Sequence, residues 1–577
     1  RSVSLGRIYG DLGFQQSALV EGWKSVNIDP TNYSAHRFLA DSYAALPRSE
    51  IARLSELLQA QLLQPINNNP VQPRLGESSP AILSGAGPVD TSFNEFSQLF
   101  NRDRVQLLTS GIAGENGTLG EEVILTGLYG RYSWSIGQLH QVTDGFRENA
   151  DIGQDIYNIF TQISVSHKLS IQGEVRFSDS ENGDIDLRFD PDNFSPTFTK
   201  ELNTRTYRLG LHHAFTTHSD LIISAFHQDF KEGQDDSTSG SIFTAEDQVE
   251  GSSIEAQYLY KTGLVNFIIG TGHLSGDEIL DITVTFEPPE EPFSTKDKST
   301  IRHSNLYLYT LINFPLNVTL TIGGSGDFFE ELTLDKDQFN PKIGVSWNPA
   351  PSTTIRLAGF RILKRSLISN QTIEPTQVAG FQQFFDDSDG TDSKRYGIGI
   401  DHKFSSDLFG GLEYTKRDME IPLIIQGQDE IIEEEARERL GRAYLYWAPF
   451  TWLVASGEYF YDRSINEDPS APKIKTHRVP LGLNLYHQYG FFAKLKTTYW
   501  DQEGIFLDSA SGSFEPGEDQ FWIADATLGF RIPKRLGILT IETKNIFDQR
   551  FHLHELDPIN PLIQPERLIF AKLTLSF

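Results

Sequence analysis

Two histidines near the C-terminus have a spacing that metal ligands can use. His552 and His554 are separated by one residue, and imidazole nitrogen is a common zinc ligand. Two side chains do not complete a zinc site, which takes three or four protein ligands. The pair is therefore a weak candidate, and the sequence predicts neither a metal site nor a cofactor.

Carboxylates are concentrated in two short segments that could offer oxygen ligands to calcium. Calcium takes six to eight oxygen ligands on a flexible loop, yet neither spacing fits a known calcium motif. We expect both segments to be solvated acidic loops. Their carboxylates are Asp179, Glu181, Asp184 and Asp186 in the first, and Asp386, Asp387, Asp389 and Asp392 in the second.

Motifs for catalysis are missing from the sequence. There is no G-x-S-x-G nucleophile elbow, no H-E-x-x-H zinc motif and no phosphate-binding glycine loop. The Gly323-Gly324-Ser325-Gly326 stretch lies in a strand-like segment and resembles none of them. We predict no catalytic residue and no enzyme.

The composition excludes several classes of protein. The 577 residues carry a net charge of −29, which argues against nucleic acid as a partner, because phosphate recognition needs a basic surface. With no Cys, disulfides and thiolate metal sites are impossible. No run of 18 apolar residues occurs, so membrane-spanning helices are not expected.

From Arg104 onward, segments of about ten residues alternate between apolar and polar side chains. This period of two predicts strands with one apolar and one wet face. The last segment shows it clearly: Ile569, Ala571, Leu573, Leu575 and Phe577 share one face, and Leu568, Phe570, Lys572, Thr574 and Ser576 share the other.

The connections between these segments alternate strictly between short and long. Ten short turns require ten hairpins, and one further strand at each end gives about 22 strands. An even number of antiparallel strands, with short turns at one end and long loops at the other, predicts an outer-membrane barrel of a Gram-negative-type bacterium. The short turns and the N-terminus are then expected on the periplasmic side. The turns are Gly130-Arg131, His167-Lys168, Thr217–Asp220, Lys261–Gly263, Phe314-Pro315, Asn348–Thr353, Ser405–Asp407, Ala448–Phe450, His487–Gly490 and Pro533–Gly537.

The long connections are acidic and are expected on the external side of the membrane. Examples are Asp179–Asn203, Lys231–Glu250, Ser275–Thr300, Leu363–Ser393 and Asp501–Asp519.

The polar face of the predicted strands carries charges of both signs, which does not suit a simple ion filter. Most are expected to pair across strands and stiffen the wall; others are expected to contact a translocated chain or an inserted segment. These predicted luminal residues are Glu174, Arg176, Arg208, Lys342, Arg356, Glu458, Lys494, Lys496, Asp525, Glu542, Lys544 and Lys572.

The first 64 residues show an internal repeat of 34 residues. Four pairs of positions match at this offset, and the period and residue types resemble tetratricopeptide (TPR) repeats; a generic pair of helical hairpins is the alternative. Because Arg1 falls inside a repeat and two repeats rarely suffice, we expect further repeats before it. The predicted packing pairs are Leu5 with Leu39, Gly6 with Ala40, Tyr9 with Tyr43, and Ala18 with Ala52.

Three domains follow from these patterns. Residues 1–64 are the end of a periplasmic TPR array, residues 65–103 are a linker or short plug-like segment, and residues 104–577 are the barrel. We expect a short helix at Ser92–Leu99 in the linker. Outer-membrane lipid and lipopolysaccharide are the partners of the barrel, and a periplasmic protein or cargo is the expected partner of the TPR region.

Three stretches of the barrel resemble TonB-dependent receptors, whose barrels have 22 strands. They are Phe339–Pro349 with Thr354–Ala358, Leu536–Asp548, and Glu566–Phe577. The terminal Phe577 is similar to the C-terminal signal by which assembly machinery recognises outer-membrane proteins. The chain departs from that family because about 35 residues between repeats and barrel are too few for its globular plug, and no TonB-contacting segment is recognisable.

A TPR array ahead of a barrel is similar, in domain order only, to exopolysaccharide exporters. We predict a translocation channel that secretes a polymer or protein recruited by the TPR repeats, and we favour secretion over import because the plug is missing. One alternative is a structural anchor for a surface or periplasmic assembly. Another is TonB-receptor-like uptake, with the plug supplied by a partner. A barrel this wide needs a lumen filler, for which we expect residues 65–100, infolded external loops or a partner chain.

Overall fold

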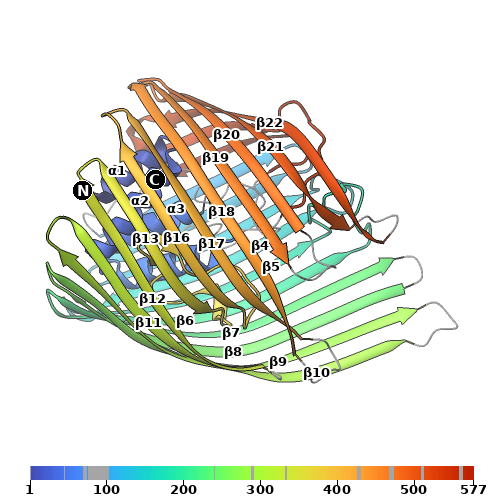
Figure 1. Ribbon diagram of the computed structural model, residues 1–577, viewed down its shortest axis with the longest axis horizontal. Coiled ribbons are helices and arrows are strands. Elements are labelled where there is room, and N and C mark those ends of the chain that lie inside the picture. Colours follow the sequence, from blue (N-terminus) through green and yellow to red (C-terminus); the bar gives the residue numbers. More distant parts are fainter. Residues whose placement is uncertain are drawn as a thin grey trace.

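The computed structural model describes residues 2–44, 46–68, 75, 103–238, 241–286, 292–331, 334–424, 431–466, 473–507, 512–555, 557 and 563–577. These residues form a closed antiparallel sheet of 22 strands, preceded by four helices (Figure 1). The predicted fold class and strand number are confirmed. None of the helices in the described ranges has the length and apolar character needed to span a membrane.

The sheet contains 22 of the 24 strands, and β14 (Gln377–Val378) and β15 (Phe381–Gln382) form a separate hairpin. The barrel strands are β1 (Arg104–Gly114), β2 (Leu119–Tyr129), β3 (Tyr132–Thr143), β4 (Ile152–Ser164), β5 (Leu169–Asn182), β6 (Thr199–Thr216), β7 (Ser219–Thr238), β8 (Ser241–Lys261), β9 (Val265–Phe286), β10 (Phe293–Phe314), β11 (Val318–Glu331), β12 (Leu334–Ala350), β13 (Thr353–Leu363), β16 (Asp392–Lys403), β17 (Leu408–Ile424), β18 (Ile431–Phe450), β19 (Leu453–Asn466), β20 (Lys473–Tyr486), β21 (Phe491–Leu507), β22 (Phe514–Ile532), β23 (Gly537–Lys544) and β24 (Leu568–Ser576).

The first and last strands close the sheet. Strands β1 and β24 pair antiparallel from Leu108 opposite Ser576 to Gly114 opposite Phe570. Beyond β24, the main chain of Phe577 exchanges two hydrogen bonds with Leu107, at 2.8 and 3.1 Å. Closure leaves no edge strand, so main-chain groups in lipid are paired.

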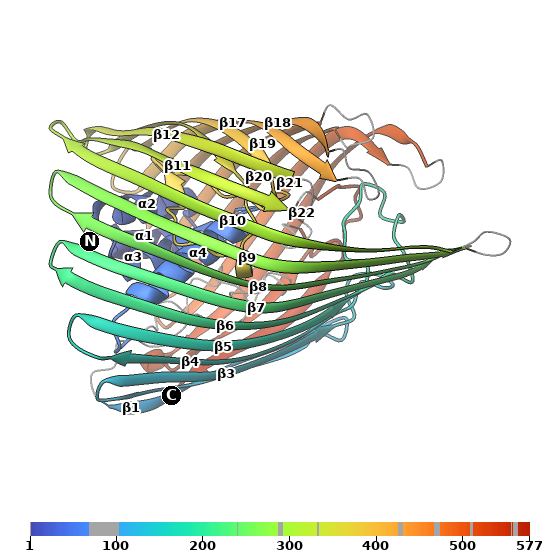
Figure 2. The same cartoon turned by 90° about the horizontal axis from the view of Figure 1, so that it is seen from below.

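Nine of the ten predicted short turns join neighbouring strands of the sheet, and the tenth, Ala448–Phe450, lies at the end of β18, just before the turn at Thr451 and Trp452. One of the tightest joins β2 to β3 through Gly130 and Arg131, and Gly130 has a φ of +56°, which favours glycine. Figure 2 shows the short turns and both chain ends at the same end of the barrel. The prediction of a periplasmic end with short turns is therefore confirmed.

Three segments expected to be long loops are instead largely paired strands: Lys231–Glu250, Ser275–Thr300 and Asp501–Asp519, the last of which pairs as far as Leu507 opposite Phe514. Strands β7 and β8 stay hydrogen-bonded as far as Thr238 opposite Ser241, and β9 and β10 as far as Val284 opposite Phe293. Lys231–Glu250 and most of Ser275–Thr300 thus continue the sheet beyond the other strands (Figure 2). The polar composition of these segments suggested loops. Strands can nevertheless extend beyond the membrane into water, because main-chain hydrogen bonds between strands do not depend on side-chain polarity.

The outer surface of the barrel is apolar at alternating positions. In β24, Ile569 and Leu573 are exposed, whereas Leu568, Phe570 and Lys572 are buried. The predicted alternation is confirmed: one face meets lipid and the other faces the lumen.

The N-terminal helices are α1 (Ser2–Asp11), α2 (Gln15–Ile28), α3 (Tyr33–Tyr43) and α4 (Glu50–Leu63). The side chain of Asn32 caps α3 by accepting from the backbone N–H groups of Ser34 and Ala35. Buried apolar side chains from α2, α3 and α4 pack into a core of their own: Leu19, Val20, Trp23, Val26, Ala35, Leu39, Tyr43 and Ala52.

The helices lie inside the barrel, near its short-turn end (Figures 1 and 2). The N-terminus is at the periplasmic end, as expected, but the helices occupy the lumen instead of extending into the periplasm. The repeat pattern could not reveal this, because a helix can present the same face to water or to a polar barrel wall. Of the 65–100 segment, only residues 65–68 and 75 are described, and the helix expected at Ser92–Leu99 lies outside the described residues.

Candidate functional site: the filled lumen

Hydrogen bonds connect the helices to the barrel wall at several points. The Gln16 backbone N–H donates to the Tyr446 hydroxyl at 3.1 Å. Lys24 Nζ donates to Thr354 Oγ1 at 2.6 Å, and Lys261 Nζ on the wall lies 2.8 Å from Asp29 Oδ1. These bonds distribute the attachment over α2 and the turn that follows it.

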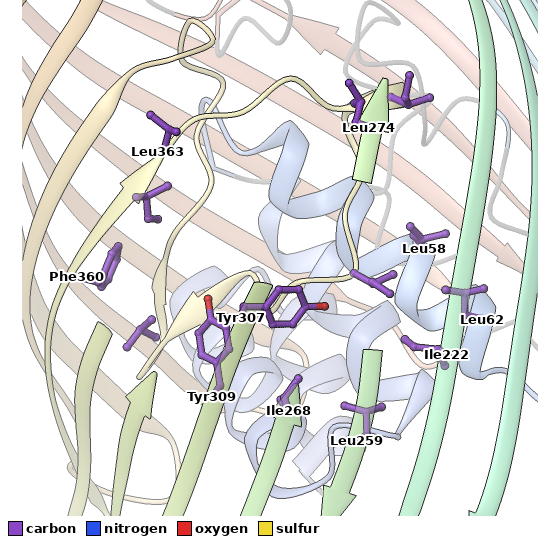
Figure 3. Packing of buried hydrophobic residues seen from close by; sticks show 14 of the residues in the cluster. Leu58, Leu62, Ile222, Leu259, Ile268, Leu274, Tyr307, Tyr309, Phe360 and Leu363 are labelled. Atoms are coloured by element: carbon purple, nitrogen blue, oxygen red, sulfur yellow. The ribbon is translucent and has the colours of Figure 1, made fainter. Parts of the chain in front are cut away.

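Apolar contacts join the same surfaces. The Phe14 ring stacks on the Tyr446 ring, with centroids 4.7 Å apart and an interplanar angle of 4°. At the other end of the helical region, Leu58 and Leu62 of α4 enter a cluster with Ile222 and Leu259 of the wall (Figure 3). Burying these side chains excludes water from two patches between helices and barrel.

One long connection folds into the lumen and meets the helices. Residues 364–391, between β13 and β16, contain β14 and β15 and reach α4. The carboxylate of Asp386 accepts from the backbone N–H groups of Glu50 and Ile51, at 3.0 and 3.1 Å. An external connection therefore supplies the N-terminal cap of α4, while the hydroxyl of Ser49 donates to Gln382 at 2.8 Å.

Further bonds fix the inserted connection, residues 364–391, along α4. The Thr372 backbone N–H donates to Ser55 Oγ at 3.1 Å, and Thr376 Oγ1 donates to the Glu56 carboxylate. Burial raises the pKa of Asp386, and its N–H donors offset part of that increase.

A chain of ion pairs joins the helices, the wall and the inserted connection. Arg48 lies 2.5 Å from Glu438 on β18, and Glu438 lies 2.7 Å from Arg417 on β17. Arg417 in turn pairs with Asp387, and its guanidinium lies 4.0 Å from the centroid of the Phe385 ring. Removing one member would leave a buried charge without a partner, so these residues hold the three parts together.

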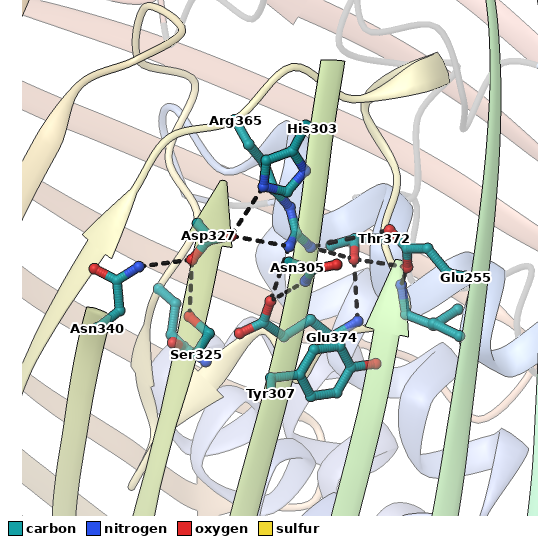
Figure 4. A network of polar contacts seen from close by, with 12 residues as sticks. Glu255, His303, Asn305, Tyr307, Ser325, Asp327, Asn340, Arg365, Thr372 and Glu374 are labelled. Atoms are coloured by element: carbon teal, nitrogen blue, oxygen red, sulfur yellow. Dashed lines mark hydrogen bonds and ion pairs between the residues drawn. The ribbon is translucent and has the colours of Figure 1, made fainter. Parts of the chain in front are cut away.

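A second network fixes the inserted connection to the other side of the wall (Figure 4). The buried guanidinium of Arg365 lies 3.2 Å from Glu374, 3.6 Å from Asp327 and 3.9 Å from Glu255. Asp327 also lies 3.0 Å from the Nε2 atom of His303. A single cation thus joins three carboxylates from the wall and the connection itself.

Helix α3 is joined to α4 by a buried histidine. His36 Nδ1 lies 2.5 Å from Glu56 Oε2, and His36 Nε2 lies 2.8 Å from the Pro30 carbonyl oxygen. Both ring nitrogens face acceptors, which favours the doubly protonated imidazolium. Burial alone would lower the pKa of His36, but Glu56 and the Pro30 carbonyl outweigh it, and the pKa is raised.

Several predicted luminal residues contact the helices or the inserted connection. Arg356 lies 3.0 Å from Asp401 and 2.7 Å from Glu413, and its guanidinium lies 5.7 Å from the Trp23 ring. Lys342 Nζ donates to Gln383 at 2.8 Å and lies 3.6 Å from Glu374. Such contacts fit the expectation of an inserted segment.

Others pair along the wall. Arg208 lies 2.6 Å from Glu174, Glu458 lies 2.6 Å from Arg442, and Lys544 lies 3.8 Å from Glu542. Two of the remaining predicted residues bond to other parts of the chain: Arg176 donates to the Leu75 carbonyl at 3.2 Å, and Asp525 accepts from the Asn545 N–H at 2.9 Å. Lys494 lies 5.6 Å from the Phe492 ring centroid. Lys496 is exposed, and Lys572 is buried.

Most predicted TPR packing residues are buried: Tyr9, Ala18, Leu39, Ala40, Tyr43 and Ala52. Leu5 is 38% exposed, and a Cβ added at Gly6 would overlap the Phe38 ring. The Tyr9 ring faces the wall, 5.2 Å from the Phe409 ring centroid. Close helix packing is thus explained, whereas the assignment to TPR repeats stays a prediction.

The metal candidates do not come together. His552 Nδ1 lies 3.5 Å from Asp519, whereas the His554 backbone N–H donates to Gln502 at 2.7 Å. Within the described ranges, the one group of three side chains positioned to hold a metal ion is His227, Asp229 and Glu250, on β7 and β8.

The expectation of solvated acidic loops is wrong for many of these carboxylates. Asp389 lies 2.5 Å from Lys364, and Asp392 lies 2.6 Å from Arg361. Asp184 binds Arg147 and Arg188, at 3.2 and 2.7 Å. The cations come from nearby in the chain, but only the folded loop brings each to its carboxylate.

Sequence reasoning missed residues that join the helices, the wall and the inserted connection, namely Arg48, Glu438, Arg417, Arg365 and Glu374, and it named Asp386 only as part of an acidic segment. The one signal was the density of charge and of Phe in the connection after Leu363, which is unusual for a solvated loop. The partners of Arg48 and Asp386 lie hundreds of positions away in the chain, beyond the reach of local pattern.

Comparison with known proteins shows which barrels this chain is similar to. No curated protein sequence matches the chain. Residues 172–361 match the sequence model of the family described as TonB dependent receptor-like, beta-barrel.

Solved structures with the same fold include three transporters. The ferric citrate transporter FecA in its unliganded form is 14% identical, with a TM-score of 0.62 over 83% of this chain and 80% of that chain. The copper transporter OprC is 11% identical, with a TM-score of 0.65 over 83% of this chain and 81% of that chain. The FrpB iron transporter from Neisseria meningitidis is 10% identical, with a TM-score of 0.63 over 83% of this chain and 82% of that chain. This chain is thus an outer-membrane β-barrel of 22 strands, and its residues 172–361 are similar to the TonB-dependent-receptor-like barrel family.

Proposed function

We propose that this protein is a gated transport channel in which helices α1–α4 are the plug. The observation that carries the proposal is the set of contacts that seats the helices against the inner wall, above all the Arg48–Glu438 pair. A barrel of 22 strands encloses a lumen wide enough to need a plug. Transport then requires the helices to move.

The contacts suit a plug that can be displaced. The helices bury an apolar core among themselves, which lets them keep their structure as one unit. Many of their contacts with the wall are hydrogen bonds and ion pairs, such as those of Gln16, Lys24 and Arg48. Water can replace such contacts at a small net cost when both partners become solvated.

Uptake is the direction that we favour. The inserted connection runs from the long-loop end of the barrel to α4, so a ligand from outside that moves it would weaken the Asp386 and Asp387 contacts. The reason for favouring export was a lumen without a plug, and helices in the lumen remove that reason. The transporters with the same fold carry ferric citrate, copper and iron by their descriptions.

Export of a polymer or protein is the second candidate. It is favoured by the 34-residue repeat, because TPR-like helices commonly present a concave surface to another chain. In this case, cargo from the periplasm would draw the helices out of the lumen.

Single-channel recordings in planar bilayers test the plug. We expect that deleting residues 2–63 raises the conductance, and that Arg48→Ala increases the frequency of brief openings because Glu438 loses one of its two cations. Arg37→Ala is the control, because Arg37 pairs with Asp41 within α3. A closed barrel after the deletion would refute the plug and favour the structural anchor.

The direction is tested separately with a purified TonB C-terminal domain. Uptake predicts that the domain binds the full chain in detergent, and more tightly when the plug is loosened by Arg48→Ala. A lack of binding in both proteins would contradict uptake and leave export.

A further inference from the structure

Three carboxylates form a row across three adjacent strands. Asp229 on β7 is opposite Glu250 on β8, and Glu250 is opposite Asp277 on β9. Residues directly opposite each other in antiparallel strands share a face, with Cβ atoms about 4.5–5.5 Å apart. Like charges in this arrangement repel each other and destabilise the sheet, so a cation beside the row would stabilise it.

The row faces the outside of the barrel. On β7, the Phe226 side chain is buried, and the Gln228 side chain accepts from the Ser369 backbone N–H of the inserted connection at 3.0 Å, so both point into the lumen. Successive side chains of a strand point to opposite faces. His227 and Asp229 therefore point outward, and their side chains are 43% and 49% exposed. Figure 2 shows β7, β8 and β9 side by side where they continue beyond the other strands.

The protein supplies little positive charge to this row. Arg205 on β6 is opposite Asp229, but no ion pair joins them in the part of the chain that the structure describes. Lys231, two residues beyond Asp229, pairs instead with Glu246 at 3.0 Å. Among the described residues, Glu250 in the middle of the row has neither an ion pair nor a hydrogen bond from its side chain. The row is thus open to a cation from solution.

A histidine beside the row completes a set of metal ligands. One ligand atom each from His227, Asp229 and Glu250 lies within 4.8 Å of the other two. Zinc lies about 2.0–2.2 Å from its nitrogen and oxygen ligands, so one ion can bind all three atoms after small rotations of these exposed side chains.

The orientation of the histidine ring suits metal binding. The His227 Nδ1 atom lies 2.9 Å from the Ser252 hydroxyl on β8, and Nε2 lies 3.7 Å from Asp229. A metal-binding histidine almost always donates its other ring N–H to an acceptor, which fixes the tautomer and the direction of the ring. Ser252 can be that acceptor, and the lone pair of Nε2 then points toward the carboxylates.

The ligand types favour a transition-metal ion of the zinc class. Imidazole suits zinc, copper and nickel, whereas calcium and magnesium take oxygen ligands. Three protein ligands and one water make a four-coordinate zinc site. The third carboxylate of the row, Asp277, accepts from the Thr300 hydroxyl at 3.0 Å, and its charge adds to the attraction for a cation.

We propose that His227, Asp229 and Glu250 bind one divalent transition-metal ion, such as zinc, which clamps β7 to β8 on the outside of the barrel. Because the ligands come from two strands, the ion acts as a cross-link between them. It also offsets the repulsion between the two opposed carboxylates. The site lies at the base of the extension formed by Lys231–Glu250, where the strands leave the membrane. The clamp does not depend on the plug or on the direction of transport.

Zinc binding to the full chain in detergent, without a histidine tag, tests the site by competition with a chromogenic chelator. We expect Ser252→Ala to weaken binding about tenfold, because outer partners of metal-bound histidines contribute ten- to a hundredfold. His227→Gln should weaken it further. The matched control is His273→Gln on β9: its Nδ1 also lies 2.9 Å from a hydroxyl across the strand pair, that of Ser304, but within the described ranges it belongs to no group of three metal ligands.

Hydrogen exchange and mass spectrometry test the clamp. Zinc should slow amide exchange in residues 228–251 of the natural chain and of His273→Gln, but not of His227→Gln. Glu250→Gln leaves both ligands on β7 and removes the ligand on β8. It should therefore also abolish the slowing.

Three outcomes would overturn the proposal. Equal zinc affinities in His227→Gln and His273→Gln would exclude the site. Displacement of zinc by an equal concentration of calcium would assign the carboxylates to a hard cation without the histidine. Zinc binding with unchanged exchange in β7 and β8 would refute the clamp. Folding of each variant is checked by its heat-dependent mobility on gels, so that loss of the barrel is not mistaken for loss of the site.

Discussion

At the scale of single residues, the carboxylates of the inserted connection show how one residue type takes different roles. Asp386, Asp387 and Asp389 are close neighbours in sequence, yet Asp386 caps a helix, Asp387 pairs with Arg417 and Asp389 pairs with Lys364. The sequence predicted one solvated cluster. Each role depends on a partner that the local sequence does not specify.

Asp386→Ala removes the cap of α4. Two N–H groups at the start of the helix would lose their acceptor, and loss of an N-cap costs about 1 kcal/mol. We expect faster amide exchange at Glu50 and Ile51, measured by hydrogen exchange and mass spectrometry. Asp179→Asn, in an exposed position on β5, is the control. Unchanged protection in Asp386→Ala would mean that Ser49 can take over the cap.

At the scale of elements, α3, α4 and the inserted connection meet around Glu56. Its carboxylate is shared by His36 and Thr376, and the hydroxyl of Tyr43 lies 3.3 Å from Thr376. Helix positions followed from periodicity and from capping residues such as Asn32. The third element, the connection, could not be predicted here, because nothing in its sequence specifies that it enters the barrel.

The shared site predicts that the seating of α3 on α4 depends on pH. Because the pKa of His36 is raised, its stabilising contribution is complete below the ordinary histidine pKa and is lost as the pH rises through the raised value. Lys261 lowers the pKa of the nearby Asp29 although burial alone would raise it, so Asp29 stays ionised across this range. We expect faster amide exchange in α3 and α4 at about pH 8.5 than at about pH 6, after correction for intrinsic rates.

His36→Gln is the test variant, because glutamine can bond to Glu56 but cannot gain a proton. In this variant the amides of α3 and α4 should exchange faster than in the natural protein at the lower pH, and their exchange should depend little on pH. The same pH dependence in both proteins would exclude His36 as its source.

At the scale of the whole molecule, closure of the sheet gives the barrel its stability in lipid. Strand β24 pairs with β1, although they are the last and first strands of the barrel in sequence. Phe577 continues that pairing by two main-chain hydrogen bonds to Leu107. Closure satisfies main-chain groups that lipid cannot. The helices then occupy the enclosed space.

Deletion of Phe577 is expected to reduce the amount of folded barrel in the outer membrane. The change removes two closing hydrogen bonds and an exposed terminal aromatic ring, which we predict to be an assembly signal. Folded and unfolded forms are separated by heat-dependent mobility on gels. Phe547→Ala, at an exposed ring between β23 and β24, is the control. Equal yields from the deletion and the control would contradict an assembly role for Phe577.

The sequence by itself determined the barrel, the number of strands and the side on which the termini lie. Alternation along Leu568–Phe577 and the ten short turns are local features, and a closed antiparallel sheet is the arrangement that satisfies them in lipid. Only the tertiary structure decided what fills the lumen. The contacts of Arg48 with Glu438, and of Asp386 with α4, join residues more than 300 positions apart. Their energies depend on geometry that no short-range pattern encodes.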